Sequence, residues 1–247
     1  MKAIILAAGR GERLGDAAAG RPKCLLRFGG KTLLQRHLEN LDRLDAGRII
    51  LVTGYRHEQI DAALAQINSR TPVETAVNPD YELGSIVSLH CAREFLADGT
   101  DTVLMDADVL YDPDILGRLF DTQSGNCFLL DRDFEPGDEP VKLCVSGAVP
   151  VEFRKIPDRA LSWDYQGESV GFFRFDAAMS ARLARKVGEY LDTGRSMEPY
   201  EDAIRDLLRE TPDLFHVEDI TGRAWIEIDF PADVARAAEI YENIVLK

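Results

Sequence analysis

The chain has 247 residues, of which 45% are hydrophobic, and it carries a formal net charge of −14. This length and hydrophobic fraction suit one large α/β domain, and the acidic charge argues against nucleic acid as a partner. The apolar runs fall short of the roughly 20 residues that a membrane span needs, so we expect a cytoplasmic protein without membrane insertion.

The first half of the sequence alternates buried strands with amphipathic helices. Continuous apolar runs such as KAIILA, residues 2–7, are typical of strands that are buried on both faces of a parallel sheet. The predicted strands are 2–7, 48–54, 72–78 and 101–108, and the predicted helices are 31–44, 57–67 and 85–97. This alternation indicates βαβ units and a parallel sheet.

The pattern changes after about residue 125, where short strands follow one another and suggest antiparallel additions. The predicted strands are 126–133, 141–147, 151–157, 168–175 and 225–229, and helices return at 176–191, at 198–210 and from Pro231. We therefore predict a single α/β domain over residues 1–247. It has three layers around a mostly parallel central sheet, with a smaller antiparallel and helical lid.

The loop after the first strand, LAAGRGERLGDAAAGRPKCLL, is rich in glycine and in basic residues. Residues 1–36 hold eight Lys and Arg side chains against two acids, so this segment is +6 and the remainder of the chain is −20. Small residues after a strand let backbone N–H groups approach a phosphate closely. A basic island within a glycine-rich turn therefore predicts a phosphate site rather than a solvated surface run.

Two common phosphate loops do not fit this segment. The P-loop requires Gly-Lys-Ser/Thr, which is absent. A dinucleotide-binding turn opens directly into a helix and needs an acid about 20 residues further on. Here a second loop with Pro22 follows, and the next strand ends in Thr53-Gly54. The Cys and His residues show no zinc spacing, so any metal is expected to be a hard cation held by carboxylates.

A third pattern does fit, in which GxGxRL is followed by Pro-Lys-x-Leu. Its residues are Gly9, Gly11, Arg13, Leu14, Pro22, Lys23 and Leu25, and further matching positions are Asn78, Tyr81, 84–89, 105–108 (MDAD) and 225–229 (WIEID). Together they resemble nucleotidyltransferases of the sugar-phosphate and choline-phosphate type, closest to cytidylyltransferases for phosphocholine, inositol phosphate or aminoethylphosphonate. The resemblance implies a Rossmann-like nucleotidyltransferase fold, with a nucleotide-binding half (1–125) and an acceptor-binding half (126–247).

The resemblance also implies Mg²⁺ held by Asp108 and Asp229. Asp106 and Asp108 alternate at a strand end, where open α/β sheets bind ligands. Asp229 follows a short apolar strand and should reach the same edge. Asp106 is placed with the nucleotide, either as a further ligand of the metal or as an orienting group.

Two cations of the loop are assigned to catalysis. Arg13 should bind the β- and γ-phosphates, and Lys23 should contact the α-phosphate and the incoming phosphate and stabilise the transition state. The attacking phosphate has a second pKa of about 6 and is already anionic, so no general base is required.

Contacts to the nucleotide are expected near the first strand and the third helix. The expected residues are Leu6, Ala7, Ala8, Gly9, Gly11, Gly84, Ser85, Ser88 and Asp106. For Ser85 and Ser88, a structural role as a helix N-cap and a surface serine fits the sequence as well as contact with the nucleotide does.

The acceptor is expected to bind in the second half of the chain, at Lys142, Glu168, Gly171, Tyr200 and Glu201. Trp163, Tyr165, Tyr190 and Tyr200 could form an aromatic cage for a quaternary ammonium, worth ~0.5–2 kcal/mol per ring, although Tyr190 reads more readily as a core residue. Glu168 or Glu201 could pair with an amine.

The sequence thus predicts a Mg²⁺-dependent enzyme that transfers a nucleotidyl group, with CTP preferred, to a phosphocholine-, aminoethylphosphonate- or inositol-phosphate-like acceptor. A sugar-1-phosphate nucleotidyltransferase using UTP, dTTP or GTP is the alternative. A molybdenum-cofactor guanylyltransferase would share the first loop, but the C-terminal acid and the lid argue against it. A non-catalytic nucleotide sensor would typically lose Lys23, Asp108 or Asp229, all of which are present. A homodimer is left open.

Overall fold

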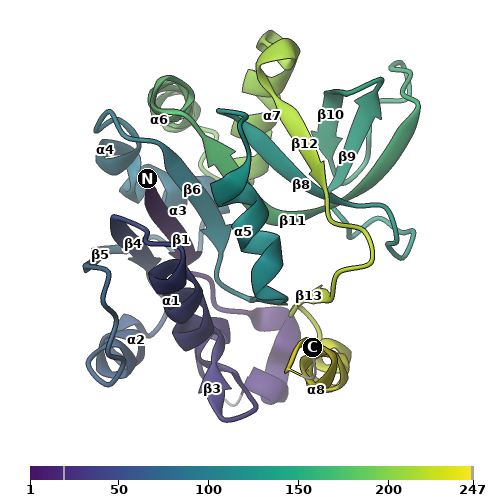
Figure 1. Ribbon diagram of the computed structural model, residues 1–247. Helices are drawn as coiled ribbons and strands as arrows, with labels where there is room; N and C mark the ends of the chain where they lie inside the picture. Colours follow the sequence, from purple (N-terminus) through teal and green to yellow (C-terminus); the bar gives the residue numbers. More distant parts are fainter. Residues whose placement is uncertain (19, 246–247) are drawn as a thin grey trace.

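The computed structural model describes residues 1–18 and 20–245 (Figure 1); Ala19 of the glycine-rich loop and residues 246–247 lie outside this description. In the described residues the centre is a nine-stranded sheet. Its strands are β1 (Lys2–Ala7), β4 (Arg48–Thr53), β5 (Val73–Val77), β6 (Thr102–Asp106), β8 (Cys127–Asp131), β9 (Lys142–Ser146), β10 (Val149–Arg154), β11 (Tyr165–Phe175) and β12 (His216–Asp219). The main order is β10-β9-β11-β6-β1-β4-β5, and β8 pairs with β11 and β12.

The main parallel part of the sheet is β5-β4-β1-β6, and β12 pairs parallel with β8 in another part of the sheet. The chain runs outward from β1 to β4 and β5 and then crosses back to β6, on the other side of β1. The strand order therefore reverses between β1 and β6. The carboxyl ends of such a pair are where open α/β sheets bind ligands.

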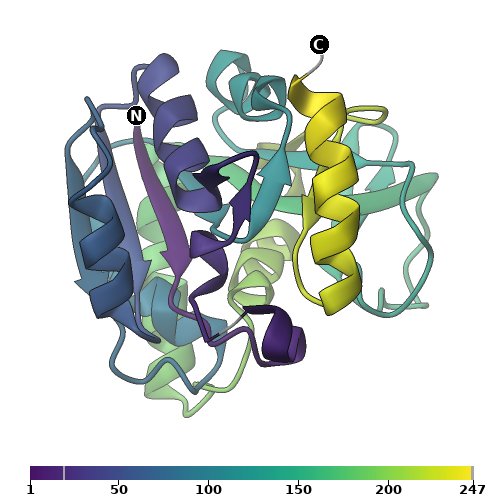
Figure 2. The ribbon, with the colours of Figure 1, turned by 90° about the horizontal axis from the view of Figure 1, so that it is seen from below.

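Helices cover both faces of the sheet (Figures 1 and 2). The helices on one face are α1 (Leu33–Arg43), α2 (His57–Leu64) and α5 (Pro113–Asp121), and those on the other are α3 (Ser85–Cys91), α4 (Arg93–Leu96), α6 (Ala177–Asp192) and α7 (Tyr200–Glu210). Side chains alternate along a strand. The side chains of Ala3 and Ile5 in β1 therefore pack in the core under α1, α2 and α5, whereas Ile4 packs in the core under α3, α4, α6 and α7. The predicted three-layer α/β architecture is confirmed.

The second half of the chain adds antiparallel strands, as its sequence predicts. The long strand β11 pairs antiparallel with β6, β8 and β9, and β9 pairs with β10. These strands extend the sheet beyond β6 and form one wall of a cavity next to the carboxyl end of the parallel strands.

A separate small core joins the two ends of the chain. The strand β13 (Trp225–Glu227) pairs antiparallel with β7 (Val109–Tyr111), and α8 (Pro231–Val245) packs against β13 and the glycine-rich loop (Figure 2). Leu14 of the loop, Leu110 of β7 and Ile228 after β13 are all buried in this core. It places the C-terminal acids beside the first loop.

Several element predictions need correction. The predicted helix 85–97 is two helices that break at Ala92, and the predicted strand 101–108 ends at Asp106 and resumes as β7. The helix α5 was not predicted, although Pro113 lies in its first turn and the Asp112 side chain caps its N-terminus. A short hairpin, β2 (Arg27–Phe28) with β3 (Lys31–Thr32), lies just before α1.

Candidate active site

The glycine-rich loop carries Lys23 to the carboxyl end of β1 and β6. After β1 the loop forms two 3-10 turns, η1 (Glu12–Ala18) and η2 (Lys23–Leu25). Gly11 has φ +63°, and a Cβ at this position would lie 2.8 Å from the Lys23 side chain. Gly9 is exposed, with open space around it. Glycine at position 11 thus lets the loop close over the stem of Lys23.

The ammonium group of Lys23 bridges two carboxylates from distant parts of the chain. Its Nζ lies 2.7 Å from Asp108 Oδ2 and 2.6 Å from Asp229 Oδ1. Burial disfavours the charged lysine, but Asp108 and Asp229 outweigh burial and raise the pKa of Lys23. The lysine is therefore held as a cation, as its predicted role requires.

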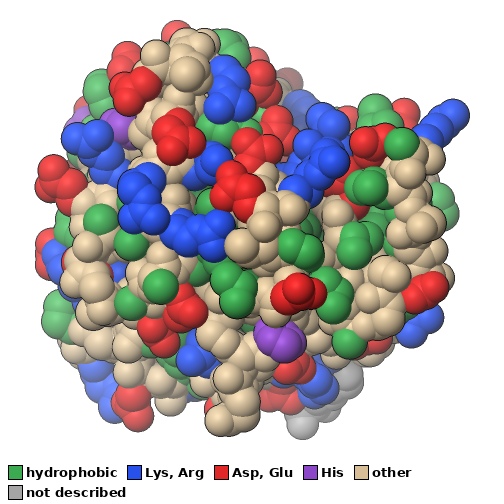
Figure 3. Space-filling model, turned by 90° about the horizontal axis from the view of Figure 1, so that it is seen from above, with side chains coloured by type: hydrophobic (Ala, Val, Ile, Leu, Met, Phe, Trp, Pro, Cys, Tyr) green, Lys and Arg blue, Asp and Glu red, His purple; other side chains and the backbone are tan. Residues whose placement is uncertain are grey.

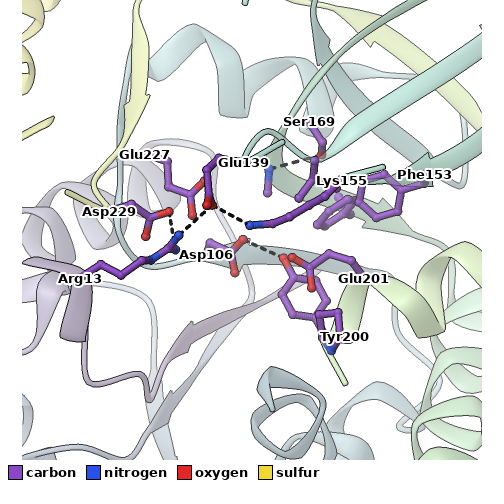
Figure 4. A pocket seen from close by; sticks show the side chains of 14 residues that line it. Arg13, Asp106, Glu139, Phe153, Lys155, Ser169, Tyr200, Glu201, Glu227 and Asp229 are labelled. Carbon is purple, nitrogen blue, oxygen red and sulfur yellow. Dashed lines mark hydrogen bonds and ion pairs between the residues drawn. The ribbon is translucent and has the colours of Figure 1, made fainter. Parts of the chain in front are cut away.

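The other cations of the site are also paired with acids (Figure 4). The Arg13 guanidinium lies 2.7 Å from Asp229 and 2.8 Å from Glu139, and Glu139 also binds Lys155 at 3.0 Å. An anion that binds to these cations would have to displace the carboxylates. Two cations of the basic island, Arg13 and Lys23, are thus paired with acids from the second half of the chain.

Three carboxylates could hold a metal ion. Single oxygen atoms of Asp108, Glu227 and Asp229 lie within 4.8 Å of one another. Desolvation, followed by the negative charges of Asp108 and Asp229, raises the pKa of Glu227 to about 8. Crowded carboxylates at the edge of a cleft are the donor set that a hard divalent cation prefers, so these residues fit Mg²⁺.

Glu227 was missed in the sequence analysis. It lies two residues before Asp229, so alternation along β13 places both side chains on the same side. That spacing was the signal that could have found it.

Asp106 faces a different partner from Asp108. The hydroxyl of Tyr200 donates a hydrogen bond of 2.7 Å to Asp106 Oδ2 (Figure 4). Burial, followed by the negative charges of Asp108 and Glu201, raises the pKa of Asp106 well above its usual range. This environment fits the orienting role that was one of the two roles expected for Asp106.

The turn between these two aspartates is supported from α1. His37 is buried, and its Nε2 lies 3.1 Å from the Ala107 carbonyl while its Nδ1 lies 3.3 Å from the Tyr111 hydroxyl. Burial lowers the pKa of His37 to about 4, so the ring is neutral at pH 7. A neutral ring can donate to the carbonyl and accept from the tyrosine.

Gly171 is packed against Asp106. Its φ is +77°, and a Cβ would lie 2.4 Å from Asp106 Oδ2. We expect Gly171→Ala to displace Asp106 and to lower kcat/KM on the order of 10²-fold, because small misplacements in an active site are costly. Gly147→Ala is the matched control, since Gly147 also has a positive φ but has open space around it. Equal activity of the two variants in a pyrophosphate-release assay would contradict this role.

The residues predicted to contact the nucleotide base lie at the ends of β1 and α3. The Leu6 and Ala8 carbonyls already accept hydrogen bonds from the Ala107 and Tyr55 N–H groups. Ala7, between them, is buried. The carbonyls of Leu6 and Ala8 are thus each used at least once within the protein.

The N-terminus of α3 holds the segment before α7. The Gly84 and Ile86 N–H groups donate to the Ser196 and Glu198 carbonyls, and the Ser85 hydroxyl accepts from the Tyr200 N–H. Gly84, not Ser85, is the N-cap residue. Ser88 is not a surface serine, because it is buried and accepts a hydrogen bond from Asn78.

A cavity of about 220 Å³ opens beside the carboxylates, between β6, β11 and the start of α7 (Figure 4). Gly171, Tyr200 and Glu201 line it, as expected for acceptor-binding residues. The residues that line it are Arg13, Asp106, Glu139, Val141, Phe153, Lys155, Ser169, Gly171, Phe173, Pro199, Tyr200, Glu201, Glu227 and Asp229.

Two residues predicted for the acceptor lie elsewhere. Lys142 is buried, and its ammonium group donates to the carbonyls of Gly137, Pro140 and Lys155. Its long side chain thus links the 137–140 segment to residue 155 through hydrogen bonds and does not line the cavity. Glu168 lines a second, more acidic cavity next to the 131–140 loop, which adjoins the first and shares Glu139, Glu227 and Asp229 with it. Burial raises the pKa of Glu168 to about 7.

The predicted aromatic cage does not form. Of its four members, Tyr200 lines the cavity, whereas Trp163, Tyr165 and Tyr190 do not. Arg132 packs over the Tyr165 ring. Tyr190 is buried, and its hydroxyl donates a hydrogen bond to Asp206. Tyr190 is therefore a core residue, as its position on α6 favoured.

On the face in Figure 3, basic and acidic side chains are interspersed rather than separated by sign. None of the helices within the described residues is long and apolar enough to cross a membrane.

The fold and this loop-and-carboxylate arrangement define an NTP transferase domain. Residues 3–162 match the MobA-like NTP transferase domain, and the chain belongs to this family. The resemblance to nucleotidyltransferases that the sequence motifs indicate is thereby confirmed.

The chain is similar to two curated enzymes and one solved structure. It is 27% identical to a CMP-5′-(3-aminopropyl)phosphonate synthase from Streptomyces rubellomurinus, over 96% of this chain and 38% of the relative. It is 26% identical to a choline-phosphate cytidylyltransferase from Streptococcus pneumoniae, over 98% of this chain and 99% of the relative. The inositol-1-phosphate CTP transferase from T. maritima shares its fold, with a TM-score of 0.78, 20% identity and coverage of 98% of this chain and 95% of that chain.

Some of the relatives are longer than this chain. The chain spans about half the length, or less, of the phosphonate synthase and of two bifunctional IPC transferase and DIPP synthases that it matches.

Proposed function

We propose that this protein transfers a cytidylyl group from CTP to a small phosphorylated or phosphonate acceptor and releases pyrophosphate. The observation that carries the proposal is the Lys23 ammonium held between Asp108 and Asp229, at the reversal point of the sheet and beside a cavity. The relatives of similar length and the phosphonate synthase, whose names specify cytidylyl or CMP products, support the choice of CTP.

In the proposed reaction an acceptor oxygen attacks the α-phosphorus of CTP. The new P–O bond forms as the bond to the pyrophosphate oxygen breaks, and the electron pair leaves with pyrophosphate. The acceptor phosphate is already anionic, so the main barrier is the approach of two anions and the charge on the leaving group.

The residues of this chain would lower that barrier by position and charge. Arg13 would hold the β- and γ-phosphates, and Lys23 would bind the α-phosphate and the attacking oxygen. Asp108 and Asp229, with Glu227 beside them, would hold Mg²⁺. When bound, this ion supplies positive charge against the phosphate oxygens and helps to orient them.

Two alternatives stay open to test. A sugar-1-phosphate nucleotidyltransferase would use the same loop and acids with UTP, dTTP or GTP. A nucleotide sensor without catalysis would bind NTP but release no pyrophosphate. The intact set of Lys23, Asp108 and Asp229, brought together in one site, supports an enzyme.

We expect CTP to stabilise the protein more than UTP, dTTP, ATP or GTP in the presence of Mg²⁺. A ligand that binds the native state at 100 times its Kd raises stability by about 2.7 kcal/mol, which is readily seen as a shift in Tm. Thermal-shift titrations with the five nucleotides at equal concentrations give the ranking. A clear preference for another nucleotide would assign the protein to a different branch of the family.

A further inference from the structure

The cavity described above has two chemically different ends. Arg13, Asp229 and Glu227 lie at the end next to the glycine-rich loop (Figure 4). At the other end, Val141, Phe153 and Phe173 form an apolar wall, with the polar side chains of Ser169 and Lys155 beside it (Figure 4). The start of α7 closes this second end with Tyr200 and Glu201.

Glu201 is a carboxylate without a cation at the apolar end. Its Oε2 atom is shielded from solvent and has no hydrogen-bond partner. In the part of the chain that the structure describes, no salt bridge involves Glu201, whereas Glu139 and Asp229 are both paired with basic residues. A shielded carboxylate oxygen without a partner is unfavourable and is explained when a ligand supplies the missing donor.

The charges of the cavity favour a positive group at this end. Five carboxylates and two basic side chains line the cavity, and Lys155, the basic residue nearer to Glu201, is bonded to Glu139. Burial raises the pKa of Glu201 to about 7, against the opposing effects of a backbone hydrogen bond and of the Lys155 charge.

The apolar wall favours an acceptor with a cationic headgroup over an acceptor with a polyol. The several hydroxyl groups of an inositol or a sugar would each need a polar partner, whereas Val141, Phe153 and Phe173 provide none from their side chains and Ser169 provides a single hydroxyl. An ammonium group on a short carbon chain fits better, because its methylene or methyl groups can contact the wall while its charge faces Glu201. The Tyr200 ring lies beside the carboxylate and can also attract a cation.

We infer that the acceptor is zwitterionic, with an ammonium group that Glu201 binds at the apolar end of the cavity. This inference rests on the proposed function, which requires a phosphate or phosphonate at the other end of the acceptor. The ammonium group is thus assigned to Glu201 rather than to Glu168, which lines the second cavity. An inositol or sugar phosphate is disfavoured as the acceptor.

Matched pairs of acceptors test the inference. 2-Aminoethylphosphonate is compared with propylphosphonate, and phosphocholine with 3,3-dimethylbutyl phosphate; each pair has nearly the same shape and differs by one positive charge. With CTP and Mg²⁺, we expect at least one pair to show kcat/KM on the order of 10-fold to 10²-fold higher for the ammonium member, since a charge-assisted contact in a partly desolvated site has this size. Equal use of both members of each pair by the wild-type protein would overturn the inference.

Two variants assign the preference to Glu201. Glu201→Gln keeps the shape of the side chain, and we expect it to remove the preference by lowering kcat/KM for the ammonium member alone. Asp202→Asn is the matched control, because Asp202 lies in the same turn of α7 but does not line the cavity; it should keep the preference. An equal loss for both members in Glu201→Gln would contradict the inference, and the CTP-induced rise in Tm checks that the variant is folded.

Equilibrium binding separates this inference from the proposed function. Isothermal titration calorimetry measures the affinity of Glu201→Gln and of Asp202→Asn for phosphocholine and 3,3-dimethylbutyl phosphate, and then for the phosphonate pair. These titrations involve no turnover. Glu201-dependent preference for an ammonium member without pyrophosphate release would overturn the proposed function alone. Pyrophosphate release without such a preference, or no binding of any of the four compounds, would overturn the inference.

Discussion

Lys23→Ala should lower kcat on the order of 10²-fold or more, a loss comparable to that of an oxyanion donor. The charge that develops on the leaving pyrophosphate appears only in the transition state, and Lys23 is the cation buried deepest in the site, with its side chain 15% exposed. Its Nζ, 2.7 Å from Asp108 and 2.6 Å from Asp229, is already placed among the carboxylates proposed to hold the metal.

Arg13→Ala is the informative comparison, because Arg13 is 45% exposed and should hold the triphosphate before and during the reaction. An interaction of equal strength in both states changes KM rather than kcat. We therefore expect a larger rise in KM for CTP than fall in kcat. Lys31→Ala, at a lysine paired with Glu39 outside the site, controls for the loss of a surface charge. If Lys23→Ala changes only KM, the assignment of the catalytic cation is wrong.

Asp108→Asn and Asp229→Asn should each lower kcat/KM on the order of 10²-fold or more without unfolding the protein. A bound divalent ion stabilises the charge of the transition state in this kind of reaction by several kcal/mol. Each substitution replaces a charged carboxylate ligand of that ion by a neutral amide. Both carboxylates lie in a crowded acidic group with Glu227, so the loss of one negative charge should not reduce the Tm of the metal-free protein strongly.

Chelation provides the independent check on the same acids. Activity should vanish in excess chelator and return with Mg²⁺ or Mn²⁺. Asp114→Asn removes an exposed carboxylate of α5 and should behave as the wild-type protein. Full activity in chelator, or in both Asp108→Asn and Asp229→Asn, would contradict a metal site built on these two acids.

The sequence predicted the parts of the site that follow from strand ends. Asp108 and Asp229 were predicted to share one edge because each follows a strand, and Lys23 was assigned from the loop motif and the resemblance. The strand before Asp229, β13, belongs to a separate two-stranded sheet with β7. The structure brings these three side chains into direct contact. Their roles stay predictions until the variants are measured.

The sequence could not predict contacts that depend on how distant segments pack. Glu139 lies in a loop without a periodic pattern, yet it pairs with Arg13 and Lys155. Lys142 has a side chain long enough to fold back onto backbone carbonyls, which no local pattern reveals. The segment 196–200 docks on the N-terminus of α3, so the polar groups of Gly84 and Ser85 are already used within the protein.

Pyrophosphate release tests most directly whether this chain joins a nucleotide to a phosphate or phosphonate. The assay combines CTP, UTP, dTTP, ATP and GTP one at a time with phosphocholine, aminoethylphosphonate, inositol phosphate and sugar 1-phosphates. We predict release only when nucleotide, acceptor and Mg²⁺ are all present, and fastest release with CTP. If no combination releases pyrophosphate from a folded protein that binds CTP, the protein is a nucleotide sensor rather than a transferase and the account is contradicted.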